Sequence, residues 1–138
     1  MEVIGIQKEN TNCNPNDLPY AVSDHATVAS DQGLITCGGY SDGSYLSKCI
    51  LQRKNGETTS FPTMTSPREY FGMVLVSDVI YAVGGWPSGR TTMETINLNG
   101  SEWTEQSLDF SVYHHCVTSI DNDKIVVTGG YDGNNVSK

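Results

Sequence analysis

The stretch Val79-Ile80-Tyr81-Ala82-Val83-Gly84-Gly85-Trp86 decides the fold. A short apolar run, of the length of a buried β-strand, ends at a glycine pair and is followed by turn-forming residues. Residues 34–40 and 125–131 repeat this order. The first glycines of the three pairs, Gly38, Gly84 and Gly129, are separated by 46 and 45 residues. Such a nearly constant spacing predicts an all-β protein built from repeated units.

Turn signals divide each complete unit into four short strands. The unit at residues 21–61 has predicted strands at 21–30, 34–37, 46–52 and 57–61. The unit at residues 62–106 has them at 71–76, 79–83, 93–98 and 103–106. Residues 107–138 contain only the first two strands of a third unit, at 114–120 and 124–128. Residues 1–20 match the last two strands, near 3–6 and 11–13, so one unit is predicted to be split between them.

The composition argues against two classes of partner. The formal net charge is −8 and there is no basic stripe, whereas nucleic acids and anionic membranes attract Lys and Arg. No run of about 18 apolar residues predicts a membrane helix. The first residues lack the basic region and longer apolar region of a signal peptide. We therefore expect a cytoplasmic protein, or a secreted one if the sequence belongs to a longer chain.

The four cysteines are Cys13, Cys37, Cys49 and Cys116. None of them forms the C-x-x-C pair that is typical of zinc sites. We expect free thiols, because a repeat protein of this length needs no disulfide framework. The alternative is a bridge between Cys37 and Cys49, which fall on adjacent predicted antiparallel strands.

The repeated pattern resembles kelch repeats, in which an apolar strand, a glycine pair, a loop with Asp-Gly, another strand and a Trp follow one another. The second unit carries most of the pattern, in Pro67-Arg68, Gly72, residues 81–85 and Trp103. The first and third units keep the glycine pair and Asp-Gly but lack the Trp. WD-type repeats have a similar length, but the Trp-Asp and Gly-His signatures are absent here.

The resemblance implies a β-propeller in which each four-stranded unit is one blade. Three blade equivalents are fewer than the roughly four to eight blades of known propellers. We therefore predict a homodimer that forms one six-bladed propeller, in which residues 3–6 of one chain pair with residues 124–128 of the other. The alternative is that the sequence is a fragment of a longer propeller.

The resemblance to kelch adaptors implies a ligand face built from the loops after Gly-Gly and the loops before the first strand of each unit. An aromatic residue follows each glycine pair, and aromatic residues with Arg are favoured at binding hot spots. The alternative role for these aromatic residues is packing between blades. For Arg68 the alternative is a structural role. Ser41, Glu69, Ser88 and Asp132 lie in the same loops. The predicted ligand-binding residues are Tyr40, Asp42, Arg68, Tyr70, Trp86, Arg90, Tyr113, His114, Tyr131 and Asn134.

These features predict a non-catalytic scaffold that binds a protein or peptide and needs no cofactor or metal. Adjacent strand residues point to opposite faces, so His114 and His115 are not expected to share a metal ion. No Ser-His-Asp order and no paired-carboxylate motif is evident. One alternative is a glycan-binding or secreted structural propeller, which glycosylation of Asn99 or Asn135 would favour. A metal-dependent or sugar-acting kelch-fold enzyme is a further alternative.

Overall fold

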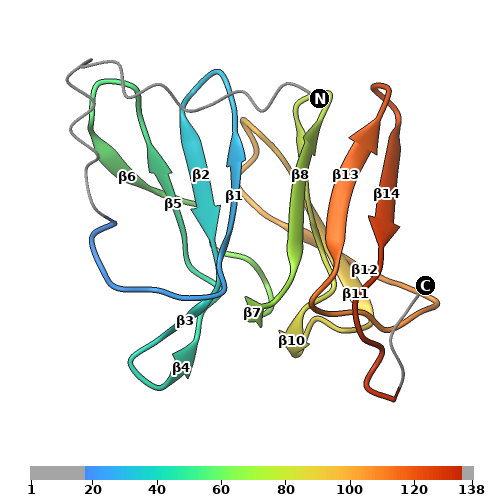
Figure 1. Ribbon diagram of the computed structural model, residues 1–138. Coiled ribbons are helices and arrows are strands. Elements are labelled where there is room, and N and C mark those ends of the chain that lie inside the picture. Colours follow the sequence, from blue (N-terminus) through green and yellow to red (C-terminus); the bar gives the residue numbers. More distant parts are fainter. Residues whose placement is uncertain (1–17, 135–138) are drawn as a thin grey trace, which may run out of the picture.

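The computed structural model describes residues 18–134, and every regular element in this range is a β-strand (Figure 1). No helix within these residues is long and apolar enough to cross a lipid bilayer. The all-β prediction is therefore confirmed for the described part of the chain.

Two four-stranded antiparallel sheets follow one another along the chain, with the orders β1-β2-β5-β6 and β8-β9-β11-β12. The strands of the first sheet are β1 (Ala26–Ala29), β2 (Leu34–Cys37), β5 (Cys49–Gln52) and β6 (Thr58–Phe61). Those of the second are β8 (Gly72–Val76), β9 (Val79–Val83), β11 (Thr92–Asn97) and β12 (Thr104–Ser107). A third sheet consists of β13 (Cys116–Ile120) and β14 (Lys124–Thr128).

The strands that lead into the glycine pairs, β2, β9 and β14, have the predicted bounds. The predicted strands at 21–30 and 114–120 begin too early, because β1 starts at Ala26 and β13 at Cys116. Asp24 and His114 have positive φ values of 55°. This left-handed conformation cannot continue a β-strand, so both strands begin after it.

The first strands of the three sheets lie next to one another, because β8 packs against both β1 and β13 (Figure 1). The main hydrophobic core lies between the first two sheets and includes Ile35, Ile80 and Ala82, each with no exposed surface. Trp103 closes this core and donates its indole N–H to the Pro62 carbonyl at 2.8 Å. The apolar strands and the Trp therefore serve sheet-on-sheet packing.

The first glycine of each complete pair allows the next sheet to approach closely. Gly38 has a φ of 67°, and a Cβ atom there would lie 2.5 Å from the Arg68 carbonyl oxygen. Gly84 has a φ of 64°, and a Cβ there would collide with the Val112 carbonyl oxygen. A larger residue would therefore be strained in its backbone and would also push the sheets apart.

The second glycine of each pair joins its sheet to the next one. The Gly39 N–H donates to the Arg68 carbonyl at 2.7 Å, and the Gly85 N–H donates to the Val112 carbonyl at 2.9 Å. Each acceptor lies just before the first strand of the following sheet. Each bond therefore links the segment after one sheet to the segment that leads into the next sheet along the chain.

The third sheet lacks these neighbours among residues 18–134. There β14 pairs with β13 alone, whereas β2 and β9 each have strands on both edges. A Cβ atom on Gly129 would meet no heavy atom within 4 Å. The described sheets thus form an open row. The predicted strands near 3–6 and 11–13 lie outside the described residues.

Two segments that were predicted as loops contain short strands. One is the hairpin of β3 (Tyr40–Ser41) and β4 (Ser44–Tyr45), and the other is the pair of β7 (Arg68–Glu69) with β10 (Trp86–Pro87). Asp42 and Gly43 have φ values of 47° and 81°. Positive φ at both central residues is what a tight two-residue hairpin turn requires.

A disulfide joins Cys37 of β2 to Cys49 of β5, which face each other across the two strands. The expectation of free thiols is therefore wrong for these two residues. Facing residues on antiparallel strands bring their Cβ atoms within bridging range. Cys116 is a free, exposed thiol, and Cys13 lies outside the described residues.

Candidate ligand-binding face

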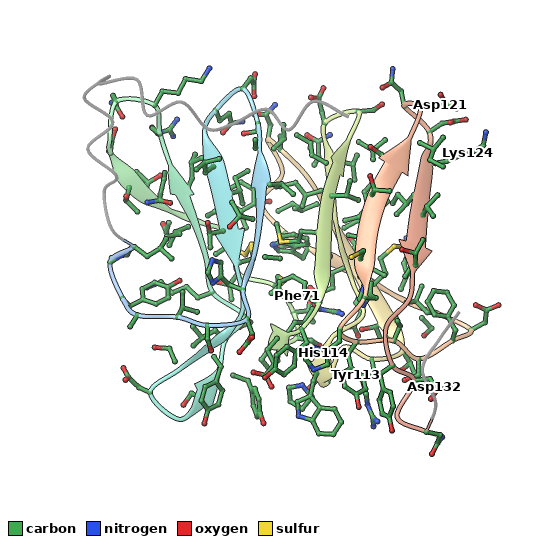
Figure 2. All side chains as sticks on the ribbon, in the orientation of Figure 1. Phe71, Tyr113, His114, Asp121, Lys124 and Asp132 are labelled. Carbon is green, nitrogen blue, oxygen red and sulfur yellow. A yellow bond between two sulfur atoms is a disulfide. The ribbon has the colours of Figure 1, made fainter. Side chains whose placement is uncertain are left out.

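The segments that follow the glycine pairs gather at one end of the three sheets (Figure 1). We call this end the loop face; it comprises residues 22–25, 40–45, 68–71, 86–90, 112–115 and 131–134. Figure 2 shows Tyr113, His114 and Asp132 at this end, and Asp121 and Lys124 at the opposite end. The loop face therefore brings together segments from all three units.

The same backbone pairing recurs in each unit on the loop face. A residue just before the first strand pairs with the aromatic residue that follows the glycine pair. The three pairs are Ser23 with Tyr40, Glu69 with Trp86, and Tyr113 with Tyr131. The repeat thus fixes one aromatic side chain per unit at an equivalent place.

The next residue of each unit has a left-handed backbone conformation. The φ values are 55° at Asp24, 54° at Tyr70 and 55° at His114. The Tyr70 N–H donates to the Asp24 carbonyl at 3.3 Å, and the His114 N–H donates to the Tyr70 carbonyl at 2.9 Å. These bonds hold the three residues in a row that crosses from the first unit to the third.

Five of the predicted ligand-binding residues form one aromatic cluster. The Tyr70 and His114 rings lie 3.8 Å apart between centroids, and Tyr113 lies 5.4 Å from His114. Tyr113 also lies 5.9 Å from Trp86 and 5.4 Å from Tyr131. All five are partly or fully exposed to solvent. We call these five residues the aromatic cluster.

Three other predicted residues lie on the loop face outside the cluster. Arg90 places its guanidinium carbon 4.8 Å from the centre of the Trp86 ring. Asp42 is exposed in the β3–β4 turn. The exposed Asn134 donates its N–H to the Asp132 carboxylate at 2.7 Å. Arg90 therefore already illustrates a cation stacked on this aromatic surface.

Tyr40 is exposed on the β3–β4 hairpin and packs its ring edge-on against Tyr45 at 5.3 Å. Its ring contact is thus within its own hairpin. It extends the loop face next to the first unit without joining the aromatic cluster.

Arg68 does not face a ligand, which corrects the prediction for this residue. It has no exposed surface, and it forms a buried ion pair with Glu94 at 3.0 Å. It also donates to the Gly84 carbonyl at 2.7 Å and to the Thr92 hydroxyl at 2.8 Å. Glu94 in turn accepts hydrogen bonds from the backbone N–H groups of residues 65 and 66. Arg68 therefore attaches the segment that connects the first two sheets to the strands of the second sheet.

Two carboxylates stand beside the aromatic cluster. Glu69 is 7% exposed, and burial raises its pKa, an effect to which the negative charge of Asp24 adds and which His114 opposes. The charge of Asp24 is also the largest cause of the raised pKa of Tyr70, followed by that of Glu69. Asp24 and Glu69 therefore place negative charge next to Tyr70 of the aromatic cluster.

His115 lies on the other side of the backbone from His114. Its Nδ1 and Nε2 atoms are buried without a well-formed hydrogen bond to any described residue. Burial lowers its pKa, and the backbone of Val83 opposes this in part. A Cβ atom on Gly84 would lie 2.9 Å from its ring, so the ring packs between the second and third sheets. Within residues 18–134 no group of three His, Cys, Asp or Glu side chains is arranged to hold a metal ion.

Asp24 is the residue of this surface that the sequence prediction missed. A signal for it exists, because Asp24, Tyr70 and His114 precede the first glycine of their units by 14, 14 and 15 residues. Aligning the units on the glycines would have placed Asp24 at the same position as these two aromatic residues.

Comparison of the chain with models of protein families and with curated proteins found no match.

Proposed function

We propose that this chain is a non-catalytic kelch-repeat scaffold that binds a protein or peptide through its loop face. The observation that carries the proposal is the aromatic cluster, which is assembled from the second and third units and left open to solvent. Exposed Trp and Tyr side chains supply large contact area and lose little entropy on binding. Short paired strands hold these side chains in place before any ligand arrives, which reduces the ordering cost.

The proposal is tested by selecting displayed peptides on the whole chain and measuring the Kd of synthetic copies. Trp86→Ala and Tyr113→Ala should each weaken binding by about tenfold or more, the scale of hot-spot residues. Both side chains are partly exposed, so their loss should leave the fold intact, which the melting temperature checks.

The matched control is Lys124→Ala at the opposite end of the sheets (Figure 2). It should leave the Kd of the same peptides unchanged. The proposal fails if Lys124→Ala weakens binding as much as the two aromatic substitutions, or if neither aromatic substitution has an effect.

The proposed architecture is a half-propeller that a second copy completes to six blades. Its support is the open side of β14, where hollows of about 370 and 570 Å³ lie in the described structure. The first is lined by apolar side chains of both neighbouring sheets, among them Val83, Met93, Ile125 and Val127. In the complete units the third strand pairs with the strand before the glycines. An apolar strand such as residues 3–6 of a second copy would occupy that position here.

The disulfide between Cys37 and Cys49 supports the secreted alternative over a cytoplasmic location. Disulfides persist in oxidising compartments and are rare where thiols are kept reduced. Asn99, in the first of the two glycosylation sequences, is exposed on the turn before Trp103. A secreted propeller would use the same loop face for its partner.

A further inference from the structure

Glu69 is nine-tenths buried yet has no salt-bridge partner among residues 18–134. It is 7% exposed, and both ion pairs in the described part of the chain belong to Arg68, with Glu94 and Glu105. No described group donates a hydrogen bond to its carboxylate. A residue this buried whose carboxylate has no donor within the protein is conspicuous, because most polar groups of buried residues have protein partners.

The surroundings of Glu69 place its side chain on the loop face. Glu69 lies opposite Trp86 in the pairing of β7 with β10. Directly opposed residues of an antiparallel pair project to the same side, with their side chains in contact range. Glu69 also feels the charges of Asp24 and His114, which lie in the row of left-handed residues. Its carboxylate oxygens are not sealed from solvent, since the buried orphan atoms in the described structure all belong to His115.

Asp24 supplies a second negative charge at the same place. It is exposed, and its backbone carbonyl accepts a hydrogen bond from the Tyr70 N–H at 3.3 Å, which ties it to the aromatic cluster. Two acidic residues therefore stand next to rings of the aromatic cluster, Glu69 opposite Trp86 and Asp24 hydrogen-bonded to Tyr70. A cation gains from both, because carboxylates pair with it and ring faces attract it.

We propose that Glu69 and Asp24, with the rings of Tyr70 and Trp86, form a site for an arginine or lysine side chain of the bound peptide. Arg90 on the Trp86 ring is the chain's own example of a guanidinium that this aromatic surface holds. The formal net charge of −8 would also draw a basic partner toward the protein. This inference rests on the proposed function and gives its partner a chemical class: a basic peptide segment.

The test uses two synthetic peptides, Ac-Gly-Ser-Arg-Gly-Arg-Ser-Gly-NH2 and the same peptide with Glu in place of both Arg. Binding to the whole chain is measured by NMR titration at one fixed ionic strength. The Arg peptide should bind and perturb the signals of Glu69 and Tyr70, whereas the Glu peptide should not. The double variant Asp24→Asn/Glu69→Gln should weaken binding of the Arg peptide by about tenfold or more.

The control is Asp121→Asn/Asp123→Asn, which removes the same amount of charge at the opposite end of the sheets (Figure 2). Asn tolerates the positive φ of Asp24 and of Asp121, so both variants keep their turns. An equal loss of affinity in the two double variants would mean non-specific attraction and overturn the site.

The two proposals fail separately. If selected peptides lose affinity with Trp86→Ala but not with Asp24→Asn/Glu69→Gln, the loop face binds ligands and the cation site is wrong. If neither change affects any peptide, both proposals are wrong.

Discussion

At the scale of single residues, the second and third units use different side chains at an equivalent position to pack against the preceding sheet. Phe71 places its ring against Gly38, and His115 places its ring against Gly84. Both rings fill the space between one sheet and the next. Phe71 has no polar ring atom, whereas the His115 imidazole has two nitrogens. Both nitrogens are buried without a well-formed hydrogen bond to any described residue.

His115→Phe should therefore stabilise the chain by about 1 kcal/mol at neutral pH, at the lower end of the cost of an unsatisfied buried polar group. The folded state lowers the pKa of His115 below 6.5. The stability that comes from keeping this ring neutral is thus present above pH 6.5 and lost as the pH falls through the lowered value. Thermal unfolding between pH 7.5 and 5 should show a smaller acid loss in the variant than in the wild type.

His25→Gln is the control for that measurement, because His25 is exposed. It should retain the acid loss of the wild type. An unchanged acid loss in His115→Phe would show that this part of the pH dependence comes from other groups.

The burial and partners of individual side chains were the features least predictable from the sequence. The Pro67-Arg68 pattern indicated a place before a first strand, but the burial of Arg68 depends on Glu94, which is 26 residues away in the chain. The partner of a long polar side chain is decided by how the sheets pack, and residue spacing does not contain that information. Glu69 was recognised only as a loop neighbour, since its burial follows from the unpredicted pairing of β7 with β10.

At the scale of elements, the strands that end at glycines were predictable to the residue. An apolar run bounded by a tight turn and by Gly-Gly has only one register that buries its side chains. The short strands β3, β4, β7 and β10 were not predicted, because two-residue strands have no periodicity to detect. They depend on Asp42-Gly43 turn geometry and on contacts between distant loops.

The disulfide is an element-scale device, because it fixes β2 to β5 within the first sheet. Its two cysteines are 12 residues apart, and closing a loop of that size is worth about 3 kcal/mol in the chain-entropy account. Adding a reductant should lower the midpoint of urea unfolding by a corresponding amount. Cys37→Ala/Cys49→Ala should be less stable and should no longer respond to the reductant.

Cys116→Ser is the matched control, since Cys116 is exposed and free. It should keep both the stability and the response to reductant. Titration of all four thiols in the denatured protein before any reduction would contradict the bridge.

At the scale of the whole molecule, the open side of β14 leads to a prediction about mass. Light scattering should give about 30 kDa, twice the 15.0 kDa of one chain, if two copies complete each other. Ile4→Asp/Ile6→Asp should shift the mass toward 15.0 kDa, because charges cannot enter the apolar hollow beside Ile125 and Val127.

Asn14→Asp/Asn16→Asp adds the same two charges to the same segment, outside the predicted strands near residues 3–6 and 11–13, and should leave the dimer intact. A single species near 15.0 kDa for the wild type would overturn the dimer and favour the alternative of a longer propeller.

The repeat itself could be predicted from three glycine pairs. Whether the sheets close into a ring depends on contacts that no single unit contains.

The glycine hydrogen bonds give the row of sheets a direction. Gly39 and Gly85 donate forward, to Arg68 and Val112. By the same repeat, the Gly130 N–H would donate at one end of the row, and the Val22 carbonyl would accept at the other. Two copies can then join only head to tail, which makes the contact heterologous. Heterologous contacts end in a ring if the rotation closes and in a filament if it does not. The Gly130 N–H that would complete a ring of two copies could therefore also join copies into an open filament, if the angle between sheets changed slightly.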